Sequence, residues 1–555
     1  MQEALSLDAP VRWRWLKKLG ERARACAPTR VEAALSALSA LLLIFSFPDF
    51  NLWPLAWVAL VPLFLAIARN PGRGRAFLTG WLMGTLFFYG SCYWLTHAAV
   101  RYGGIPSWIA FLLLVPGALI VGLFPGLCAW LLARALMRWG VRALFAAPLF
   151  WVALEWVRLG VTGQLWNAIG YSQAYVPGLI QTARWGGVYA VGFLIVTMNA
   201  ALAHLLLRRS KRTLIMTFIV TALIALVLAG AHLEAKSEMS ANLSEETTAV
   251  IIALQPNVPM DPVESMVEMA ALIERHRSLS EAALYEWEKS QPLGQRPIVA
   301  RVVIWPESPM RFAYARDSEF REFVGQFAMK NRTSVIFNSQ EPAPGDGSYN
   351  AAVMVNEEGR LVAQYDKIRL LPFGEYVPLP RWLPGVSLIP VLVGDFTPGV
   401  DYPLMPLGQT RAGVFICFES AFPSIARRFA QDGADVLVNI SNDGYLGETP
   451  VMRQHLANAV FRAVENARPV VRVTNTGITA FITSRGEVRD TTAGFQTATR
   501  TWEVKRANVG QTFYTRRGDL FVGTCAVITL LIFGMSLRKQ NSEARSQESE
   551  EMKIK

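Results

Sequence analysis

Long apolar segments at both ends of the chain enclose a polar centre, and this arrangement limits the fold more than any other feature. About 20 apolar residues are needed to cross the hydrocarbon core of a bilayer. Between 31 and 232 such segments follow one another with only short polar loops between them, and one more stands near the C-terminus. The pattern predicts eight transmembrane helices: 31–47, 52–68, 76–99, 106–133, 143–159, 186–207, 213–232 and 519–537.

The composition excludes an ordinary soluble protein and a disordered chain. Hydrophobic residues make up 52% of the chain and charged residues only 17%, whereas soluble domains carry about 25% charged residues. A chain with so much apolar surface does not stay unfolded in water. Five cysteines in 555 residues cannot form a disulfide framework. Pro116 and Pro125 predict that 106–133 is one long, kinked helix.

Basic residues gather in alternate loops, and this distribution predicts the orientation of the chain. They lie before the first span and after the second, fourth, sixth and eighth spans, for example Arg14, Arg75, Arg138, Arg212 and Lys539. Basic loops stay on the cytoplasmic side, so both termini are expected there and 233–518 on the far side. The first span follows a basic arm and leads into further spans, which indicates a signal anchor. Because the arginines are dispersed over loops, the net charge of +11 does not indicate a nucleic-acid partner.

The predicted organisation has five parts: a basic arm at 1–30, a membrane domain with seven helices at 31–232, a soluble-type domain at 233–518, the eighth helix at 519–537, and a charged tail at 538–555. We expect the tail to be disordered. Strands and helices alternate in 233–518, which predicts an α/β domain with a layered sheet of mixed direction. Expected strands are 249–257, 301–307, 334–340, 411–418, 435–440 and 469–475, with hairpins at 350–366 and 479–491 and helices at 262–289, 317–330, 423–431 and 451–467.

The segment 371–402 combines six prolines with aromatic residues that include Phe373, Tyr376 and Trp382. Loops of this length are usually functional or disordered, and the aromatic residues argue against disorder. Because the domain is tethered to a membrane at both ends, we expect an apolar lid that dips into the membrane interface and grips lipid.

Three residues that end predicted strands form a candidate active site. Cys417, the only cysteine of 233–518, stands where a strand ends and a helix begins, and Glu307 and Lys367 end two other strands. Side chains at such edges of α/β sheets face ligand crevices. A carboxylate can accept the thiol proton, and an ammonium group can stabilise a thiolate or an oxyanion. Together they predict acyl transfer, although each residue alone is better explained by packing or by a solvated strand end.

The sequence gives little support to other catalytic arrangements. His276 and His455 are the only histidines of the domain, and neither belongs to a zinc-binding pattern or to a Cys–His pattern. The sequence also lacks a GxxxxGK[ST] loop, which disfavours nucleotide hydrolysis. We therefore expect no metal ion at the site.

Three motifs resemble the nitrilase superfamily in kind and in order: Trp305-Pro306-Glu307, Tyr365-Asp366-Lys367 and Cys417-Phe418-Glu419. The strings LPFGEYVP at 371–378, SND at 441–443 and TNTGI at 474–478 narrow this resemblance. With the predicted spans on both sides of the domain, the chain over about 31–537 resembles the apolipoprotein N-acyltransferase family of bacterial inner membranes. Each motif alone is weak, and their combination is specific.

The resemblance implies a four-layer αββα nitrilase fold for 233–518, on the periplasmic side of the membrane. Glu307 would be the general base, Lys367 the oxyanion-stabilising cation and Cys417 the nucleophile. Glu375 would support Lys367 or the proton relay, and Glu419 would be a further carboxylate near the thiol. An acyl chain would pass from a phospholipid to the cysteine as a thioester, and then to the α-amino group of a diacylglyceryl apolipoprotein, without a cofactor.

The chain departs from the family at two positions near these motifs. Phe418 stands where Tyr is frequent, and Tyr445 stands where Trp is common. Both residues, with Trp382 of the predicted lid, are candidate contacts for the lipid substrate. The departures concern lipid contacts and leave the catalytic three unchanged.

Two strings of the membrane domain, 154–158 and 166–173, are also similar to the family. Trp166 is therefore a further candidate substrate contact. Glu155 and Arg158 lie one helical turn apart near a span end, where they could receive a lipid headgroup or position the soluble domain. A helix-end pair that reaches to the membrane interface explains these two residues equally well.

Three other functions fit parts of the pattern. A membrane-anchored amidohydrolase would use the same three residues with water, but an anchor needs one span rather than eight. A transporter would show repeated, broken spans with ionisable residues at the midplane, and the sequence has no clear internal repeat. An inactive binding module would not need an intact Glu307, Lys367 and Cys417. Acyl transfer fits best, and a monomer is expected because nothing demands an oligomer.

Overall fold

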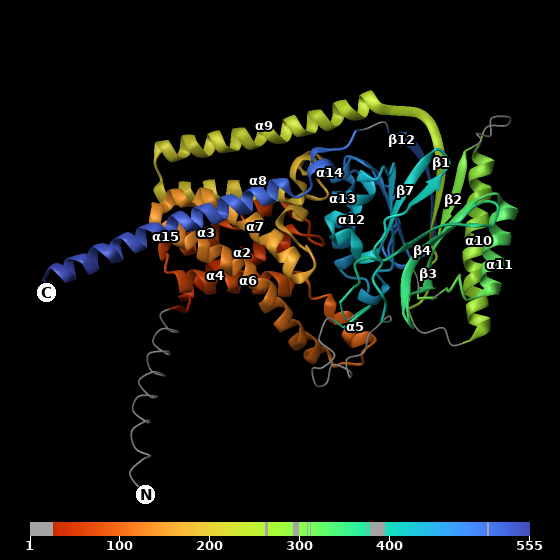
Figure 1. The fold of residues 1–555 in the computed structure, drawn as a ribbon, viewed down its shortest axis with the longest axis horizontal. Helices are drawn as coiled ribbons and strands as arrows, with labels where there is room; N and C mark the ends of the chain where they lie inside the picture. The colour runs from red at the N-terminus through yellow and green to blue at the C-terminus, as the bar shows by residue number, and fades with distance from the viewer. Residues whose placement is uncertain are drawn as a thin grey trace, which may run out of the picture.

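A helical part and an α/β part adjoin one another along the long axis of the molecule (Figure 1). The computed structural model of the protein describes residues 26–260, 265–291, 299–307, 309–310, 312–372, 374–377, 395–507 and 510–554, and among these it describes no side chains at 239–246, 507 and 538–554. The helical part comprises 30–242 and 520–554, and the α/β part comprises 243–507. A short helix, α14 (Phe513–Arg517), leads from one part to the other.

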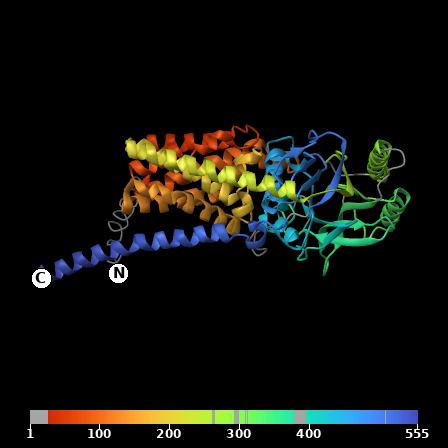
Figure 2. The same ribbon diagram turned by 90° about the horizontal axis from the view of Figure 1, so that it is seen from above.

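The helical part consists of long apolar helices joined by short connections. In both views α9 runs along the outside of the other helices toward the α/β part, and α15 leads away from it to the C-terminus (Figure 2). The elements are α2 (Arg30–Ser46), η1 (Trp53–Trp57), α3 (Val61–Arg69), α4 (Arg73–Ser91), α5 (Leu95–Arg101), α6 (Ser107–Trp139), η2 (Gly140–Ala146), α7 (Ala147–Thr162), η3 (Ile169–Gln173), η4 (Pro177–Leu179), α8 (Ala183–Arg208), α9 (Lys211–Asn242) and α15 (Leu520–Ile554).

The predicted count of eight transmembrane helices is not confirmed. Within the described residues, four stretches are long and apolar enough to cross a membrane: Ser107–Thr162, Ala183–Arg208, Lys211–Glu238 and Leu520–Leu537. The first contains two predicted spans, because η2 follows α6 directly and α7 follows η2 directly, so that one helical stretch runs from Ser107 to Thr162. The predicted span 52–68 is divided between η1 and α3, each with a proline in its first turn, where proline is tolerated because no helical hydrogen bond is lost.

Two other predictions for the helical part have different outcomes. α6 is one helix that contains both Pro116 and Pro125, as predicted. The charged tail was expected to be disordered, but α15 continues through it to Ile554. The sequence 538–554 is rich in Glu, Lys, Arg, Gln and Ser and contains no proline or glycine. Most of these are good helix formers, so a helix that starts in the apolar segment meets no residue that stops it.

Helices α4 and α6 pack closely through small residues. Both carry a pair of glycines four residues apart: Gly80 and Gly84 on α4, and Gly122 and Gly126 on α6. A Cβ atom added to Gly80 would lie 2.5 Å from the Cβ atom of Ala129. Small residues at this spacing allow the backbones of two helices to approach each other within a membrane.

Gly122→Leu is expected to force α4 and α6 apart, because a Cβ atom there would lie 2.8 Å from the main-chain nitrogen of Thr85. Overpacking of this kind costs about 1–3 kcal/mol or more, which should appear as a lower apparent melting temperature in detergent. Gly117→Leu is the matched control on the same helix, since a Cβ atom added there meets nothing within 4 Å. Equal losses in the two variants would show that close packing of these helices does not set the stability.

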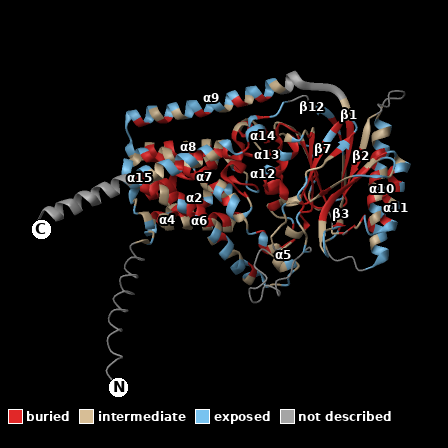
Figure 3. Ribbon diagram, viewed as in Figure 1, coloured by how far each residue is buried: buried red, intermediate tan, exposed pale blue. Residues whose placement is uncertain are grey.

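Much of α9 is exposed, whereas the buried residues gather inside the bundle and between the sheets (Figure 3). Many of the exposed residues of α9 are apolar. Phe218 is 72% exposed and Leu226 is 68% exposed. A contiguous apolar surface of this kind is unusual on a soluble monomer and suits a helix that faces lipid. The exposed apolar helices therefore support a membrane protein.

The α/β part contains two six-stranded sheets, in the orders β12-β1-β2-β3-β4-β5 and β11-β10-β9-β8-β7-β6. In the first sheet β1, β2 and β3 run parallel to one another, and in the second sheet β7, β8 and β9 do so. The other neighbouring strands are antiparallel. The strands are β1 (Leu243–Gln255), β2 (Ala300–Ile304), β3 (Ser334–Pro342), β4 (Ser348–Val355), β5 (Leu361–Asp366), β6 (Leu404–Leu407), β7 (Thr410–Ile416), β8 (Val436–Ser441), β9 (Val470–Thr474), β10 (Ala480–Ile482), β11 (Val488–Arg489) and β12 (Ala498–Ala507).

The two sheets lie between two layers of helices, which makes four layers in all. Helices α10 (Met266–Ser290) and α11 (Ser318–Asn331) lie at the outer end of the molecule (Figure 1). Val250 and Ile252 of β1 belong to the apolar cluster under these helices, whereas Ile251 and Ala253 belong to the cluster shared with the second sheet. This alternation is the two-residue period of a strand buried on both faces.

Helices α12 (Pro423–Gln431) and α13 (Val451–Asn466) form the fourth layer, between the second sheet and the helical part. The predicted sheet of mixed direction is confirmed, in the form of two such sheets. The strands and helices predicted from periodicity are confirmed, with ends that shift by a few residues. β6 and β12 were not predicted, because short or charged strands show little apolar contrast.

Candidate active site

The candidate residues Glu307, Lys367 and Cys417 follow the ends of β2, β5 and β7. β2 and β5 belong to the first sheet and β7 to the second, so the site lies where the two sheets meet at one edge. Parallel strands that end at the same edge bring their following residues together. The structure thus assembles the three residues from segments that are far apart in the sequence.

Lys367 lies between two carboxylates. Its Nζ atom is 2.8 Å from Oε1 of Glu375 and 3.7 Å from Oε1 of Glu307, and its side chain is only 1% exposed. Burial alone would lower the pKa of Lys367, but Glu375 and Glu307 outweigh burial and raise that pKa well above its ordinary value. The ammonium group therefore stays charged, as a cation that stabilises an oxyanion must.

Asn350 completes this arrangement, and the sequence analysis did not single it out. Its Nδ2 atom donates to Oε1 of Glu307 at 3.0 Å and to Oε1 of Glu375 at 2.7 Å. It lies at the start of the hairpin opposite Lys367, whose main-chain N–H donates to the Asn350 carbonyl. Aligning the two strands of the predicted hairpin residue by residue could have identified Asn350, because the register places it opposite Lys367.

Cys417 occupies a strained turn between β7 and the short helix η6 (Cys417–Ala421). Its φ angle is +53°, a left-handed conformation that side-chain-bearing residues rarely adopt. Burial raises the pKa of the Cys417 thiol well above its ordinary value and Glu307 raises it further, while Lys367 and a hydrogen bond from Ser441 lower it only in part. At neutral pH the resting group is thus a thiol, and it needs a base before it can attack.

Glu419 stabilises the turn at Cys417 through hydrogen bonds. Its Oε1 atom accepts from the main-chain N–H groups of Ile368 and Arg369, its Oε2 atom accepts from that of Ile416, and both accept from the Tyr365 hydroxyl, all within 2.8–3.0 Å. These donors lie on both sides of the gap between β5 and β7. The carboxylate therefore joins the segment of Lys367 to the segment of Cys417, and its described partners are these donors rather than the thiol.

Aromatic residues of both parts of the molecule meet beside Cys417. The ring of Phe418 stacks on Trp166, with centroids 5.9 Å apart and planes 17° apart. Trp166 also lies 5.6 Å from the ring of His455. Tyr445 makes an edge contact with Tyr102, at the end of α5. The helical part therefore forms one wall of the site.

Gln454 of α13 connects this wall to the helical part. Its side-chain oxygen accepts from the indole N–H groups of Trp94 at 3.1 Å and Trp166 at 2.9 Å, and its side-chain nitrogen donates to the carbonyls of Pro48 and Ser91. The residue is buried. Nothing in the local sequence distinguishes it from other polar residues on an amphipathic helix.

Gln454→Leu is expected to weaken the contact between the two parts of the molecule. Each buried polar group that is left without a partner costs about 1–3 kcal/mol, so the apparent melting temperature in detergent should fall markedly. Arg453→Leu is the control on the neighbouring position, because its pair with Asp49 is more than half exposed and such pairs contribute about 0–1 kcal/mol. A melting temperature of Gln454→Leu that matches the control would contradict this role.

Glu155 and Arg158 lie on α7, inside the helical part. Both are buried, and they line a pocket whose other walls are mostly apolar. Glu155 accepts from the main-chain N–H of Ile169 at 2.8 Å, and Arg158 donates to the carbonyl of Trp166 at 2.8 Å. A pair that reaches out to the membrane interface is therefore wrong, because the two side chains hold the loop that carries Trp166. Their proposed contact with a lipid headgroup stays a prediction.

Trp382 and most of the predicted lid, 378–394, lie outside the described residues. So do Ser308 and Phe373. Among the residues that the structure describes, no group of three or more His, Cys, Asp or Glu side chains is placed to hold a metal ion.

Two family models match the chain. Residues 39–201 match the apolipoprotein N-acyltransferase N-terminal domain, and residues 273–514 match carbon-nitrogen hydrolases. Among solved structures, an amidase from Nesterenkonia sp. is 17% identical, covers 51% of this chain and 98% of its own, and has a TM-score of 0.36.

Two apolipoprotein N-acyltransferases are similar to this chain over most of its length. The apolipoprotein N-acyltransferase of Geobacter metallireducens is 33% identical over 522 residues, which cover 92% of this chain and 96% of that protein. That of Rhizobium meliloti is 30% identical over 467 residues, which cover 81% of this chain and 85% of that protein.

Proposed function

Because the chain belongs to the apolipoprotein N-acyltransferase family, we propose that Cys417 carries an acyl group from a phospholipid to the N-terminal amine of a diacylglyceryl apolipoprotein. The chain is an enzyme that N-acylates lipoproteins, with a lipid donor. A membrane-anchored amidase that uses the same residues is not favoured, since it would not need the N-terminal domain matched at 39–201.

One observation carries the proposed mechanism: a buried, charged Lys367 lies between two carboxylates beside a protonated thiol, and the helical part lines the same site. Lys367, the two carboxylates and the thiol are the groups that thioester chemistry needs. The helical part places those groups where a two-chain lipid resides, because Trp166 and Phe418 form an apolar wall at the junction with the apolar helices.

In the first half-reaction Glu307 accepts the thiol proton as Sγ of Cys417 attacks the ester carbonyl of the phospholipid. The negative charge that develops on the carbonyl oxygen is stabilised by the ammonium group of Lys367. The C–O bond then breaks, Glu307 returns the proton to the departing alkoxide, and a lysophospholipid leaves. The product on the protein is an acyl thioester.

In the second half-reaction the N-terminal amine of the apolipoprotein attacks the thioester carbonyl. Glu307 removes a proton from the amine as the new C–N bond forms, and it returns that proton to the sulfur as the C–S bond breaks. Glu375 and Asn350 keep Lys367 and Glu307 in place throughout. Chemistry of this kind, in two steps through one covalent intermediate, uses the same three groups twice and no cofactor.

We propose the following placement in the cell. The enzyme lies in a bacterial inner membrane with 31–232 and 519–537 in the bilayer, 233–518 in the periplasm, and the arm 1–30 and the tail 538–555 in the cytoplasm. The alternation of basic loops supports this orientation. The segment 371–402 acts as a lipid-gripping lid, with Trp382 in contact with substrate, and Tyr445 lies at the same junction. The enzyme acts as a monomer.

The proposal is tested by following the acyl group. Purified protein is incubated with a phospholipid of known chain length, digested and analysed by mass spectrometry. We expect an acyl-sized, hydroxylamine-sensitive adduct on the peptide that contains Cys417, and its discharge when a diacylglyceryl peptide is added. If folded protein with lipid forms no adduct, the thioester route is wrong; if water discharges the adduct as fast as the peptide does, the amidohydrolase is the better description.

A further inference from the structure

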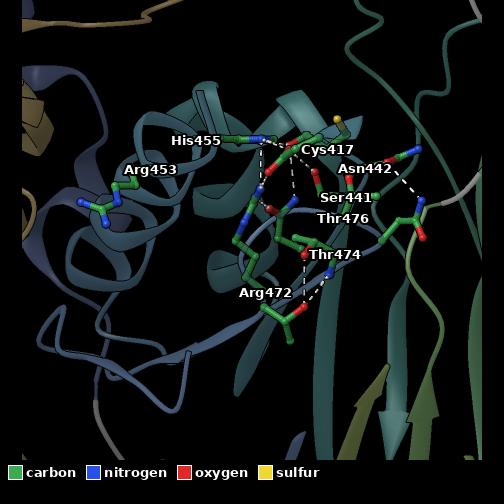
Figure 4. A network of polar contacts seen from close by, with 12 residues as sticks. Cys417, Ser441, Asn442, Arg453, His455, Arg472, Thr474 and Thr476 are labelled. Atoms are coloured by element: carbon green, nitrogen blue, oxygen red, sulfur yellow. Dashed lines mark hydrogen bonds and ion pairs between the residues drawn. The ribbon is translucent and has the colours of Figure 1, made fainter. Parts of the chain in front are cut away.

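A buried polar cluster contacts the main chain of Cys417. It consists of Asn439, Asp443, His455 and Arg472, and we call it the carbonyl clamp. Figure 4 shows His455 and Arg472 of this cluster beside Cys417. All four side chains are at least 97% buried. The mechanism above uses none of them, and the sequence analysis set His455 aside because no Cys–His pattern surrounds it.

The clamp holds the main chain of Cys417 rather than its sulfur. Nε2 of His455 lies 2.9 Å from the Cys417 carbonyl oxygen, and Nδ2 of Asn439 donates to the same oxygen at 3.3 Å. Since a carbonyl oxygen only accepts hydrogen bonds, Nε2 of His455 must carry a hydrogen. His455 is therefore not placed to serve as the base for the thiol.

Arg472 and Asp443 fix the two donors. One guanidinium nitrogen of Arg472 donates to Oδ1 of Asn439, and the other donates to Oδ2 of Asp443 at 2.8 Å. Oδ1 of Asp443 lies 2.8 Å from Nδ1 of His455. Burial would raise the pKa of Asp443, but Arg472 and His455 outweigh it and hold that pKa well below its ordinary value. The carboxylate thus stays charged and holds the guanidinium of Arg472, one nitrogen of which lies 3.1 Å from Nδ1 of His455 and can donate to it while the N–H of Nε2 faces the Cys417 carbonyl.

A glycine leaves room for this arrangement. A Cβ atom added to Gly477 would lie 2.2 Å from Oδ2 of Asp443. The position lies in the string TNTGI, and the structure explains why a side chain is excluded there.

From this geometry we infer that His455, with Asn439, Asp443 and Arg472, is a positioning residue that holds Cys417 in its left-handed conformation and thereby aims Sγ at Glu307 and Lys367. The inference rests on the proposed function, because it takes Cys417 as the nucleophile. A left-handed φ is unfavourable for a residue with a side chain, so the turn persists only while other groups hold it. A hydrogen bond to the carbonyl of the strained residue acts directly on that conformation.

Two substitutions at one position separate positioning from packing. In His455→Gln the side-chain amide nitrogen takes the place of Nε2 and can still donate to the Cys417 carbonyl. In His455→Asn an amide nitrogen takes the place of Nδ1 and can still face Asp443, but the donor to the carbonyl is lost. We expect the maximal rate of thioester formation to fall about tenfold in His455→Asn, which is the size of one buried hydrogen bond, and to stay within about threefold of wild type in His455→Gln. The phospholipid concentration at half-maximal rate should be unchanged in both.

The same variants are compared by the rate at which iodoacetamide alkylates Cys417, a measurement that needs no lipid. It should follow the same order, so the inference is tested even if the wild-type protein forms no acyl adduct and the proposed function fails. His276→Asn is the control for loss of a buried histidine, because His276 lies on α10 and its side chain bonds only to the Leu272 carbonyl among its described polar contacts; its alkylation rate should equal that of wild type. Equal losses in His455→Asn and His455→Gln, or no loss in either, would overturn the inference.

If His455→Asn does not fold, Asn439→Ser tests the inference instead, because it removes the longer donor to the same carbonyl. A loss of about threefold in the alkylation rate is expected, and an unchanged rate would also overturn the inference.

Discussion

Glu307→Gln is expected to slow acylation of Cys417 by about 10²–10⁴-fold at neutral pH, the range that a positioned general base contributes. The reason is the state of the thiol, since burial and Glu307 itself raise the pKa of Cys417 well above its ordinary value. Without a base, only the small thiolate fraction can react. The amide of glutamine keeps the shape of the side chain, so the protein should accumulate in the membrane as the wild type does. The measurement is the single-turnover rate of adduct formation.

The pH dependence of alkylation gives a second, independent readout of Glu307→Gln. Because the raised pKa of Cys417 lies above the range tested, its thiolate fraction grows about tenfold for each pH unit between pH 7 and 9. The rate at which iodoacetamide alkylates Cys417 in Glu307→Gln should rise by the same factor. Cys417→Ala gives the zero level for both assays. Glu341→Gln is the matched control, since Glu341 is a buried carboxylate of β3 whose partners are Ser339 and the main chain of Ala315. Near-normal turnover in Glu307→Gln would refute its role as the base.

Lys367→Met should reduce both turnover and stability. Methionine fills a similar volume but leaves the carboxylates of Glu375 and Glu307 buried without their cation. Removing one partner of a buried ion pair typically costs about 3–5 kcal/mol, and loss of a group that stabilises an oxyanion typically lowers kcat by about 10²–10³-fold. The measurements are the apparent melting temperature in detergent and the rate of thioester formation.

A double substitution separates the two effects of Lys367. In Lys367→Met with Glu375→Gln, one uncompensated charge has been removed, so part of the stability should return while turnover stays low. Lys330→Met is the surface control, because its pair with Glu281 involves a lysine side chain that is 66% exposed and should contribute about 0–1 kcal/mol. Recovery of turnover in the double variant would mean that Lys367 serves only to balance the charge of Glu375.

The catalytic candidates could be predicted from the sequence because they sit at strand ends. Glu307, Lys367 and Cys417 each follow a segment whose period reveals a strand, and strand ends of an α/β fold converge at an edge. Glu375 was implied by the family motif, and the structure places it 2.8 Å from Nζ of Lys367. Asn350 was missed because its importance comes from the partner strand, and partners are not visible in a single segment.

The orientation of a polar side chain was the hardest property to predict. Glu419 was expected near the thiol, which stays a prediction, and its oxygens are bonded to main-chain N–H groups of Ile368, Arg369 and Ile416. The spacing in the sequence does not reveal these partners, because two of them lie on a segment about 50 positions away. The count of eight membrane spans is not confirmed for a related reason: hydropathy reports how apolar a segment is but not where its helix breaks or continues.

The sequence by itself determined which segments are apolar, where most strands and helices of 243–507 lie, and which three residues stand at converging strand ends. These properties depend on periodicity and on neighbours along the chain. Only the tertiary structure decided which buried polar groups meet: Gln454 bonds to Trp94 across 360 positions, and His455 reaches the carbonyl of Cys417 across 38. A buried polar group needs a partner, but packing in three dimensions selects that partner, and the order of residues along the chain does not.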